Sequence, residues 1–135
     1  MFRHTILFLF ITLFGYTAFA QKDIPKEMVF SYVEQMPKYK ENVNEYLARN
    51  IVYPLKARQN GIQGQVIIGF IVNADSTLSE FKVYRGIGDG CDEEALRVIK
   101  GMGKWIPGKQ SGHTVPVRFT LPILFKLNDP VDSKK

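Results

Sequence analysis

The sequence predicts an α+β fold, in which a small antiparallel sheet of about three strands packs with two helices. Two stretches carry apolar residues at helical spacing, and three carry the alternating or continuously apolar pattern of strands. They follow one another as helix, strand, strand, helix and strand. If the first twenty residues are a leader that is removed on export, about 115 residues remain, which suits one domain with one core.

The first twenty residues are typical of a secretory signal peptide. Arg3 gives a basic start, an apolar run covers 5–14, and the small-x-small sequence Ala18-Phe19-Ala20 closes the segment. The run is shorter than the roughly 20 residues that span a bilayer comfortably. We expect cleavage after Ala20, and the alternative is an uncleaved helix that anchors the chain in a membrane. The expected divisions are a signal peptide (1–20), an N-terminal extension (21–40), a folded domain (41–128) and a flexible tail (129–135).

The first elements of the domain are a weak strand and a helix. Residues 28–34 alternate weakly, which predicts an extra N-terminal strand that ends at Met36-Pro37. Asn42 and Glu45 then have the spacing of a capping box. Apolar residues recur at helical spacing up to Pro54, which predicts a helix over about 43–51 with the stripe Val43, Leu47 and Ile51.

Two strands and a second helix follow. Residues 65–72 form a nearly continuous apolar run rich in β-branched residues, which predicts a buried central strand. Turn residues over 73–76 join it to a strand over 78–85, so the two form a hairpin. The three acids of 92–94 suit the first turn of a helix. Its buried stripe is expected to be Ala95, Val98, Ile99 and Met102, and Gly101 and Gly103 end it. A turn over 105–108 and a polar loop over 109–112 then lead to the last strand.

The last strand, over 115–127, has an apolar residue at every odd position. The odd side chains are expected to cover a core and the even ones to face solvent. Pro116 and Pro122 have the same parity, so both missing N–H donors fall on one side of the strand, which predicts an edge strand. The remaining donors on that side are expected to be free for another chain: Arg118, Thr120, Leu124 and Lys126.

Several kinds of chemistry lack support in the sequence. The formal net charge of +5 is spread along the chain, which argues against nucleic-acid binding. Cys91 is the sole cysteine, expected to be a small residue near a helix start or, alternatively, a disulfide link between two chains. His113 is the sole histidine beyond the leader, so we expect no metal site. The acids of 92–94 are expected to be solvated, and we expect neither catalysis nor a cofactor.

Four sequence blocks in fixed order carry a resemblance to a known family. They are Tyr53-Pro54 with Ala57-Arg58, Gly61-Ile62-Gln63-Gly64, Trp105-x-Pro107-Gly108, and Ile123-Leu124-Phe125-Lys126. Over about 43–127 the chain resembles the C-terminal domain of TonB, in a version of the Bacteroidetes type. Each block also has a structural explanation. Pro54 is expected to end a helix, Gly61 and Gly64 to take backbone angles unfavourable for other residues, and Trp105 with Pro107 and Gly108 to pack before the edge strand.

The resemblance implies a non-enzymatic periplasmic module that binds the TonB box of an outer-membrane receptor by strand addition, in TonB-dependent transport. The contacts that it implies here are Arg49, Asn50, Ile51, Val52, Tyr53 and Pro54, with Arg118, Thr120, Leu124 and Lys126. Alternatively, Ile51 and Tyr53 pack in the core, and Arg118 and Lys126 are simply solvated. Other candidate partners are another envelope protein or a second copy of the chain. Because about 20 residues separate Ala20 from the first helix, energy transduction by this chain alone is not expected.

Overall fold

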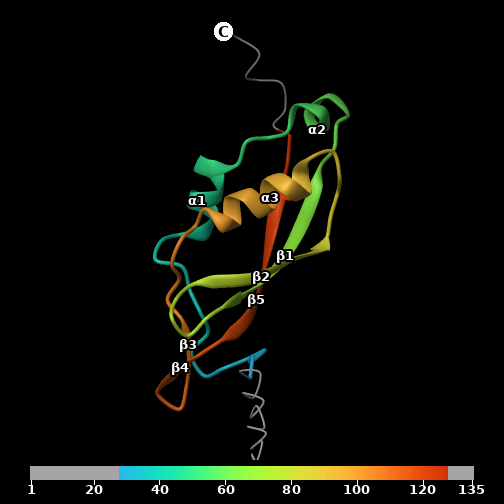
Figure 1. The fold of residues 1–135 in the computed structure, drawn as a ribbon. Coiled ribbons are helices and arrows are strands. Elements are labelled where there is room, and N and C mark those ends of the chain that lie inside the picture. The colour runs from blue at the N-terminus through green and yellow to red at the C-terminus, as the bar shows by residue number, and fades with distance from the viewer. Residues whose placement is uncertain (1–27, 128–135) are drawn as a thin grey trace, which may run out of the picture.

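The computed structural model describes residues 28–127, so the expected leader, its cleavage site and the C-terminal tail lie outside the described residues. Within this range the order is helix, helix, strand, strand, helix and three strands. None of the helices in the described range is long and apolar enough to cross a membrane. The α+β prediction is confirmed, with a main antiparallel sheet of three strands and helices α1 and α3 on one of its faces (Figure 1).

The main sheet has the order β2-β1-β5. β1 (Gly64–Val72) is the central strand, β2 (Leu78–Arg85) forms the predicted hairpin with it, and β5 (Val117–Phe125) is an edge strand as predicted. β1 and β5 pair without a break from Gly64 opposite Phe125 to Val72 opposite Val117. The β1–β2 pairing has two register shifts. This unbroken pairing with β1 leaves β5 as an outer strand of the sheet.

The core lies between this sheet and helix α3 (Cys91–Lys100). Ala95, Val98 and Ile99 of α3 are buried, and Met102 just beyond it is buried too, which confirms the predicted stripe. They pack on the even residues of β1 and the odd residues of β5, because side chains alternate along a strand. Trp105 is 2% exposed and packs against aromatic rings from three parts of the chain: Tyr39, Phe70 and Phe119.

The predicted N-terminal strand over 28–34 is absent from the structure. The segment instead makes isolated bridges, from Phe30 to Val117, Gln35 to Lys109 and Lys38 to Ile106. The weak alternation reflects the burial of Val33, which is 1% exposed, and not a continuous ladder. We call residues 28–40 the strap, since they run past the end of the sheet at which β5 begins (Figure 1).

The region before β5 also differs from the prediction. The predicted turn over 105–108 is extended, and the predicted loop over 109–112 belongs to a hairpin of β3 (Gly108–Gln110) and β4 (His113–Val115). The positive φ angles of Ser111 and Gly112 (50° and 77°) suit a two-residue turn between twisted strands. The long strand predicted over 115–127 is thus broken at Pro116, which is buried instead of solvent-facing.

Pro54 does not end the first helix. Helix α1 (Val43–Asn50) stops at Asn50, and Pro54 is the N-cap of a second, short helix, α2 (Leu55–Gln59), that the sequence analysis missed. A residue that precedes proline avoids helical backbone angles, so the chain from Ile51 to Tyr53 is extended between the two helices. Asn42 caps α1 as predicted, because its Oδ1 accepts from the N–H of Glu45 at 3.2 Å.

Candidate functional site

A groove of about 620 Å³ lies between α1, the extended residues after it and the last part of β5. One wall comes from a single face of α1 and the residues that follow: Asn44, Leu47, Ala48, Ile51, Tyr53 and Arg58. The other wall comes from the ends of β1 and β5: Gln65, Pro122, Ile123, Leu124, Phe125 and Lys126. The groove therefore runs beside the outer edge of the sheet.

Tyr53 joins the two walls of the groove. Its ring meets that of Phe125 edge-on, with centroids 5.6 Å apart, and its hydroxyl donates to the carbonyl of Ile62. The guanidinium of Arg58 lies 5.7 Å from the centre of the same ring. Burial raises the pKa of the Tyr53 hydroxyl, so this group stays protonated and able to donate. Tyr53 and Ile51 pack against the core and also line the groove.

Helix α3 fixes the residues that lead to Tyr53. Glu94 accepts from the backbone N–H of Val52 at 2.9 Å, and Arg97 donates to the carbonyl of Asn50 at 3.0 Å. Arg97 also pairs with Glu94, which holds the pKa of the Glu94 carboxyl below its usual range. Asp92 accepts from the N–H of Ile87 at 2.8 Å. The expectation that these acids are simply solvated is therefore wrong for Asp92 and Glu94.

The outer edge of β5 is partly occupied. The N–H of Arg118 donates to the carbonyl of Phe30 at 2.8 Å, so the expectation of a free donor at Arg118 is wrong. The unbroken ladder places the N–H groups of Thr120 and Leu124 on the same outer side. Within residues 28–127, neither of these two groups has a hydrogen-bond partner on that side. The edge thus offers free donors beside the groove, separated by Pro122.

Charge at the groove has one sign. Arg58 and Lys126 both line it, and no Asp or Glu of the described chain does so. Two cations on a wall that is otherwise apolar or uncharged favour a ligand that carries at least one carboxylate.

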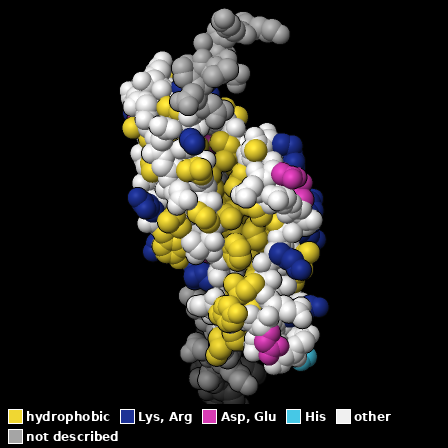
Figure 2. All heavy atoms as spheres, turned by 180° about the vertical axis from the view of Figure 1, so that it is seen from behind, with side chains coloured by type: hydrophobic (Ala, Val, Ile, Leu, Met, Phe, Trp, Pro, Cys, Tyr) yellow, Lys and Arg dark blue, Asp and Glu magenta, His cyan; other side chains and the backbone are white. Residues whose placement is uncertain are grey.

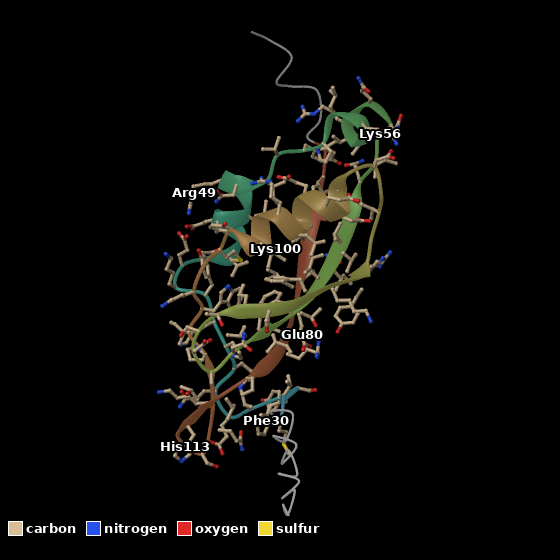
Figure 3. The ribbon with its side chains drawn as sticks, viewed as in Figure 1. Phe30, Arg49, Lys56, Glu80, Lys100 and His113 are labelled. Carbon is tan, nitrogen blue, oxygen red and sulfur yellow. The ribbon has the colours of Figure 1, made fainter. Side chains whose placement is uncertain are left out.

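The structure brings together four of the ten predicted contact residues, since Ile51, Tyr53, Leu124 and Lys126 line one groove. The other six lie outside its lining. Arg49 projects from the outer side of α1 (Figure 3) and pairs with Glu41 at 2.9 Å, while the half-buried side chain of Arg118 pairs with Glu80 at 3.3 Å. The remaining four are Asn50, Val52, Pro54 and Thr120.

Sequence analysis missed several residues of the groove. Three of the residues it missed, Asn44, Leu47 and Ala48, share one face of the helical pattern with the predicted contact Ile51, since the last three lie three, four and seven residues after Asn44. That spacing was a usable signal, whereas the approach of Arg58 and Gln65 depends on tertiary packing. Among the predicted motif residues, Gly61 and Gly64 have φ angles of +62° and +148°, which only glycine adopts without strain.

Hydrophobic side chains also gather along the reverse face of the molecule (Figure 2). Leu124 is 61% exposed and Tyr84 is 48% exposed. The ring of Tyr84 lies against the backbone of Gly69, where an added methyl group would come within 1.9 Å of it. Strand alternation places Leu124, an even residue of β5, on the side of the sheet opposite the core.

Comparisons with known proteins agree with one another. A model of the C-terminal domain of Gram-negative bacterial TonB proteins matches residues 49–127. A curated relative, the protein TonB of Helicobacter pylori (strain ATCC 700392 / 26695), is 30% identical over 78 residues, which cover 57% of this chain and 26% of the relative. The chain thus spans about a quarter of the length of that relative.

Two solution structures of the TonB C-terminal domain of Helicobacter pylori share the fold. The longer form has 25% identity and a TM-score of 0.50, and it covers 64% of this chain and 78% of its own. The shorter form has 26% identity and a TM-score of 0.51, and it covers 64% of this chain and 91% of its own.

Proposed function

Because the chain belongs to the family of Gram-negative bacterial TonB C-terminal domains, we propose that it binds an extended peptide of an outer-membrane receptor as an added strand on the outer edge of β5. Members of this family interact with outer-membrane receptors in TonB-dependent transport. The observation that carries the proposal is that the outward N–H groups of Thr120 and Leu124 have no hydrogen-bond partner within residues 28–127, and that Leu124 also lines the groove. The role is binding in the periplasm and not catalysis.

The groove supports a specific arrangement of the peptide. Main-chain groups of the peptide would pair with Thr120 and Leu124, and its side chains would alternate between two environments. One set would enter the groove beside Leu47, Ile51 and Tyr53, and the other would lie over the exposed reverse face near Leu124. A peptide with alternating apolar residues and one carboxylate near Arg58 or Lys126 fits both sides.

A proline substitution tests the edge directly. Thr120→Pro removes an outward N–H from an exposed position while the ladder to β1 is kept, so affinity for the peptide falls about tenfold or more. The probes are synthetic peptides copied from the N-terminal segments of the organism's outer-membrane receptors, and the measurement is isothermal titration.

The matched control is Thr114→Pro. Thr114 is exposed in β4, pairs with Lys109 one step from the hairpin turn, and lies outside the lining of the groove. Its N–H points away from β3, so the same substitution leaves peptide affinity within about twofold. The proposal is overturned if none of the receptor peptides binds the unaltered chain, or if Thr120→Pro binds them as tightly.

A further inference from the structure

We infer that Phe30 of the strap sets the limit of the docking edge, so that a visiting peptide is confined to residues 120–126, from the middle of β5 to the residue directly after it. This inference rests on the proposed function and specifies the length of the partner segment. The strap and the peptide would lie one after the other along the same outer edge of β5. Phe30 is then a residue that determines specificity although it lies outside the groove.

Two backbone hydrogen bonds place Phe30 on this edge. Its N–H donates to the carbonyl of Pro116 at 2.9 Å, and its carbonyl accepts from the N–H of Arg118 at 2.8 Å. These bonds form a parallel bridge to Val117, at the beginning of β5 (Figure 3). Phe30 thus uses the same outward groups of β5 that an added strand would need there.

The rest of the strap holds Phe30 in position. Gln35 exchanges two backbone hydrogen bonds with Lys109, at 3.1 and 2.9 Å, and Lys38 exchanges two with Ile106, at 3.1 and 2.8 Å. Val33, which lies between Phe30 and Gln35 in the sequence, is buried at 1% exposed. A bound peptide would need to break several such bonds to displace the strap. The strap is therefore part of the fold and not a loose occupant of the site.

The strap leaves the edge directly after Phe30. Ser31 is exposed and Tyr32 is 80% exposed, and no part of the described chain pairs with the outward N–H of Thr120. The free edge therefore begins beyond the N–H of Arg118. At about 3.4 Å per residue, the stretch to Lys126 accommodates about seven residues of an added strand. A longer peptide must turn away from β5 at the strap, and its extra residues make no ladder bonds.

The test compares two lengths of one receptor-derived peptide, about seven and about eleven residues, on the intact chain and on two variants. Phe30→Pro removes the donor to Pro116, and the control Tyr32→Pro places a proline at an exposed position of the same segment. The unaltered chain and Tyr32→Pro bind both lengths equally, within about twofold. Phe30→Pro binds the longer peptide about three- to tenfold more tightly than the shorter one, because loss of the Phe30 N–H leaves the carbonyl of Pro116 free and weakens the bridge that occupies Arg118.

Amide hydrogen exchange of the free chain provides a measurement that needs no variant. The N–H of Arg118 exchanges slowly and those of Thr120 and Leu124 exchange fast. Equally fast exchange of Arg118, or tighter binding of the longer peptide by the unaltered chain, overturns the role of Phe30 and leaves the proposed function standing. Failure of both peptide lengths to bind the unaltered chain is instead the failure of the proposed function, and it removes the premise of this inference too.

Discussion

The carboxylate of Glu94 on α3 accepts a hydrogen bond from the backbone N–H of Val52 at 2.9 Å, although 42 residues separate them in the sequence. Arg97, one helical turn along, pairs with Glu94 and donates to the carbonyl of Asn50. Because Val52 directly precedes Tyr53, this link connects the core helix to the wall of the groove. The acidic first turn of α3 therefore has a structural role in positioning the candidate site.

Removal of the Glu94 charge is expected to weaken this link. Glu94→Gln lowers the free energy of unfolding by about 1–3 kcal/mol, because the acceptor of the hydrogen bonds from Val52 and Arg97 loses its negative charge. Urea denaturation followed by tryptophan fluorescence measures the change. The matched control is Glu93→Gln, an exposed acid in the same helical turn, which changes stability by less than about 0.5 kcal/mol. Equal effects of the two substitutions would contradict the link.

The same link predicts a dependence of stability on pH. The hydrogen bond from Arg97 lowers the pKa of Glu94 in the folded state, so the unfolded chain takes up the proton first as the pH falls. The stabilisation by Glu94 is complete above the unfolded pKa of about 4.3 and is lost as the pH falls through the lower folded pKa. The stability difference between the unaltered chain and Glu94→Gln therefore shrinks below about pH 4. A difference that is constant from pH 7 to pH 3 would exclude this explanation.

The hydroxyl of Tyr53 is expected to stabilise the groove wall. Tyr53→Phe keeps the ring against Phe125 and removes the hydrogen bond to the carbonyl of Ile62, so the free energy of unfolding falls by about 0.5–1.5 kcal/mol. Thermal unfolding by circular dichroism measures it. Tyr32→Phe is the control, because Tyr32 is 80% exposed, and it leaves stability unchanged. A destabilisation of similar size in the control would rule out the assigned bond.

Gly108 lies where three parts of the chain meet. A methyl group there would come within 2.7 Å of Cγ2 of Val117, 3.1 Å of Cγ2 of Val33 and 3.2 Å of the carbonyl oxygen of Gln35. Gly108→Ala therefore lowers the free energy of unfolding by about 1–3 kcal/mol. Chemical denaturation of a double-mutant cycle with Val117→Ala provides the check, since the effect of the added methyl is smaller when Val117 is truncated. Strict additivity would contradict the steric explanation.

Cys91 is expected to be inert in the folded chain. Its side chain is fully buried, and burial raises the pKa of its thiol, so little thiolate is available. This position also does not suit the alternative of a disulfide between two chains. Labelling with a thiol reagent stays slow in buffer and becomes complete in urea. A second cysteine introduced at the exposed residue Gln59 reacts at once and serves as the control, whereas fast labelling of Cys91 in buffer would show that the start of α3 opens readily.

Most of the sheet could be predicted from local patterns. A continuous apolar run predicted β1, the turn residues after it predicted the hairpin with β2, and apolar residues at odd positions predicted β5. The structure has all three strands. The shared parity of Pro116 and Pro122 identified the edge strand correctly, because a missing N–H is tolerated only on an unpaired side. The four-block resemblance to the TonB domain is confirmed by the family model.

The remaining elements depend on contacts that a local pattern does not contain. The strap lies against β5 through single bridges, so Phe30 has no strand signature, yet it occupies the donor of Arg118 that was expected to be free. Pro54 begins α2 as its N-cap instead of ending α1, and the local sequence is compatible with either role of the proline. In the groove, Arg58 of α2 and Gln65 of β1 come together only through tertiary packing.

The most direct test of the account is amide hydrogen exchange, measured by NMR before and after addition of a peptide from the N-terminal segment of an outer-membrane receptor. If the peptide adds as a strand to the β5 edge, the amides of Thr120 and Leu124 become protected by about tenfold or more, while Arg118, already bonded to Phe30, is unchanged. A peptide that binds and protects amides elsewhere, with Thr120 and Leu124 still exchanging freely, would contradict strand addition at the β5 edge.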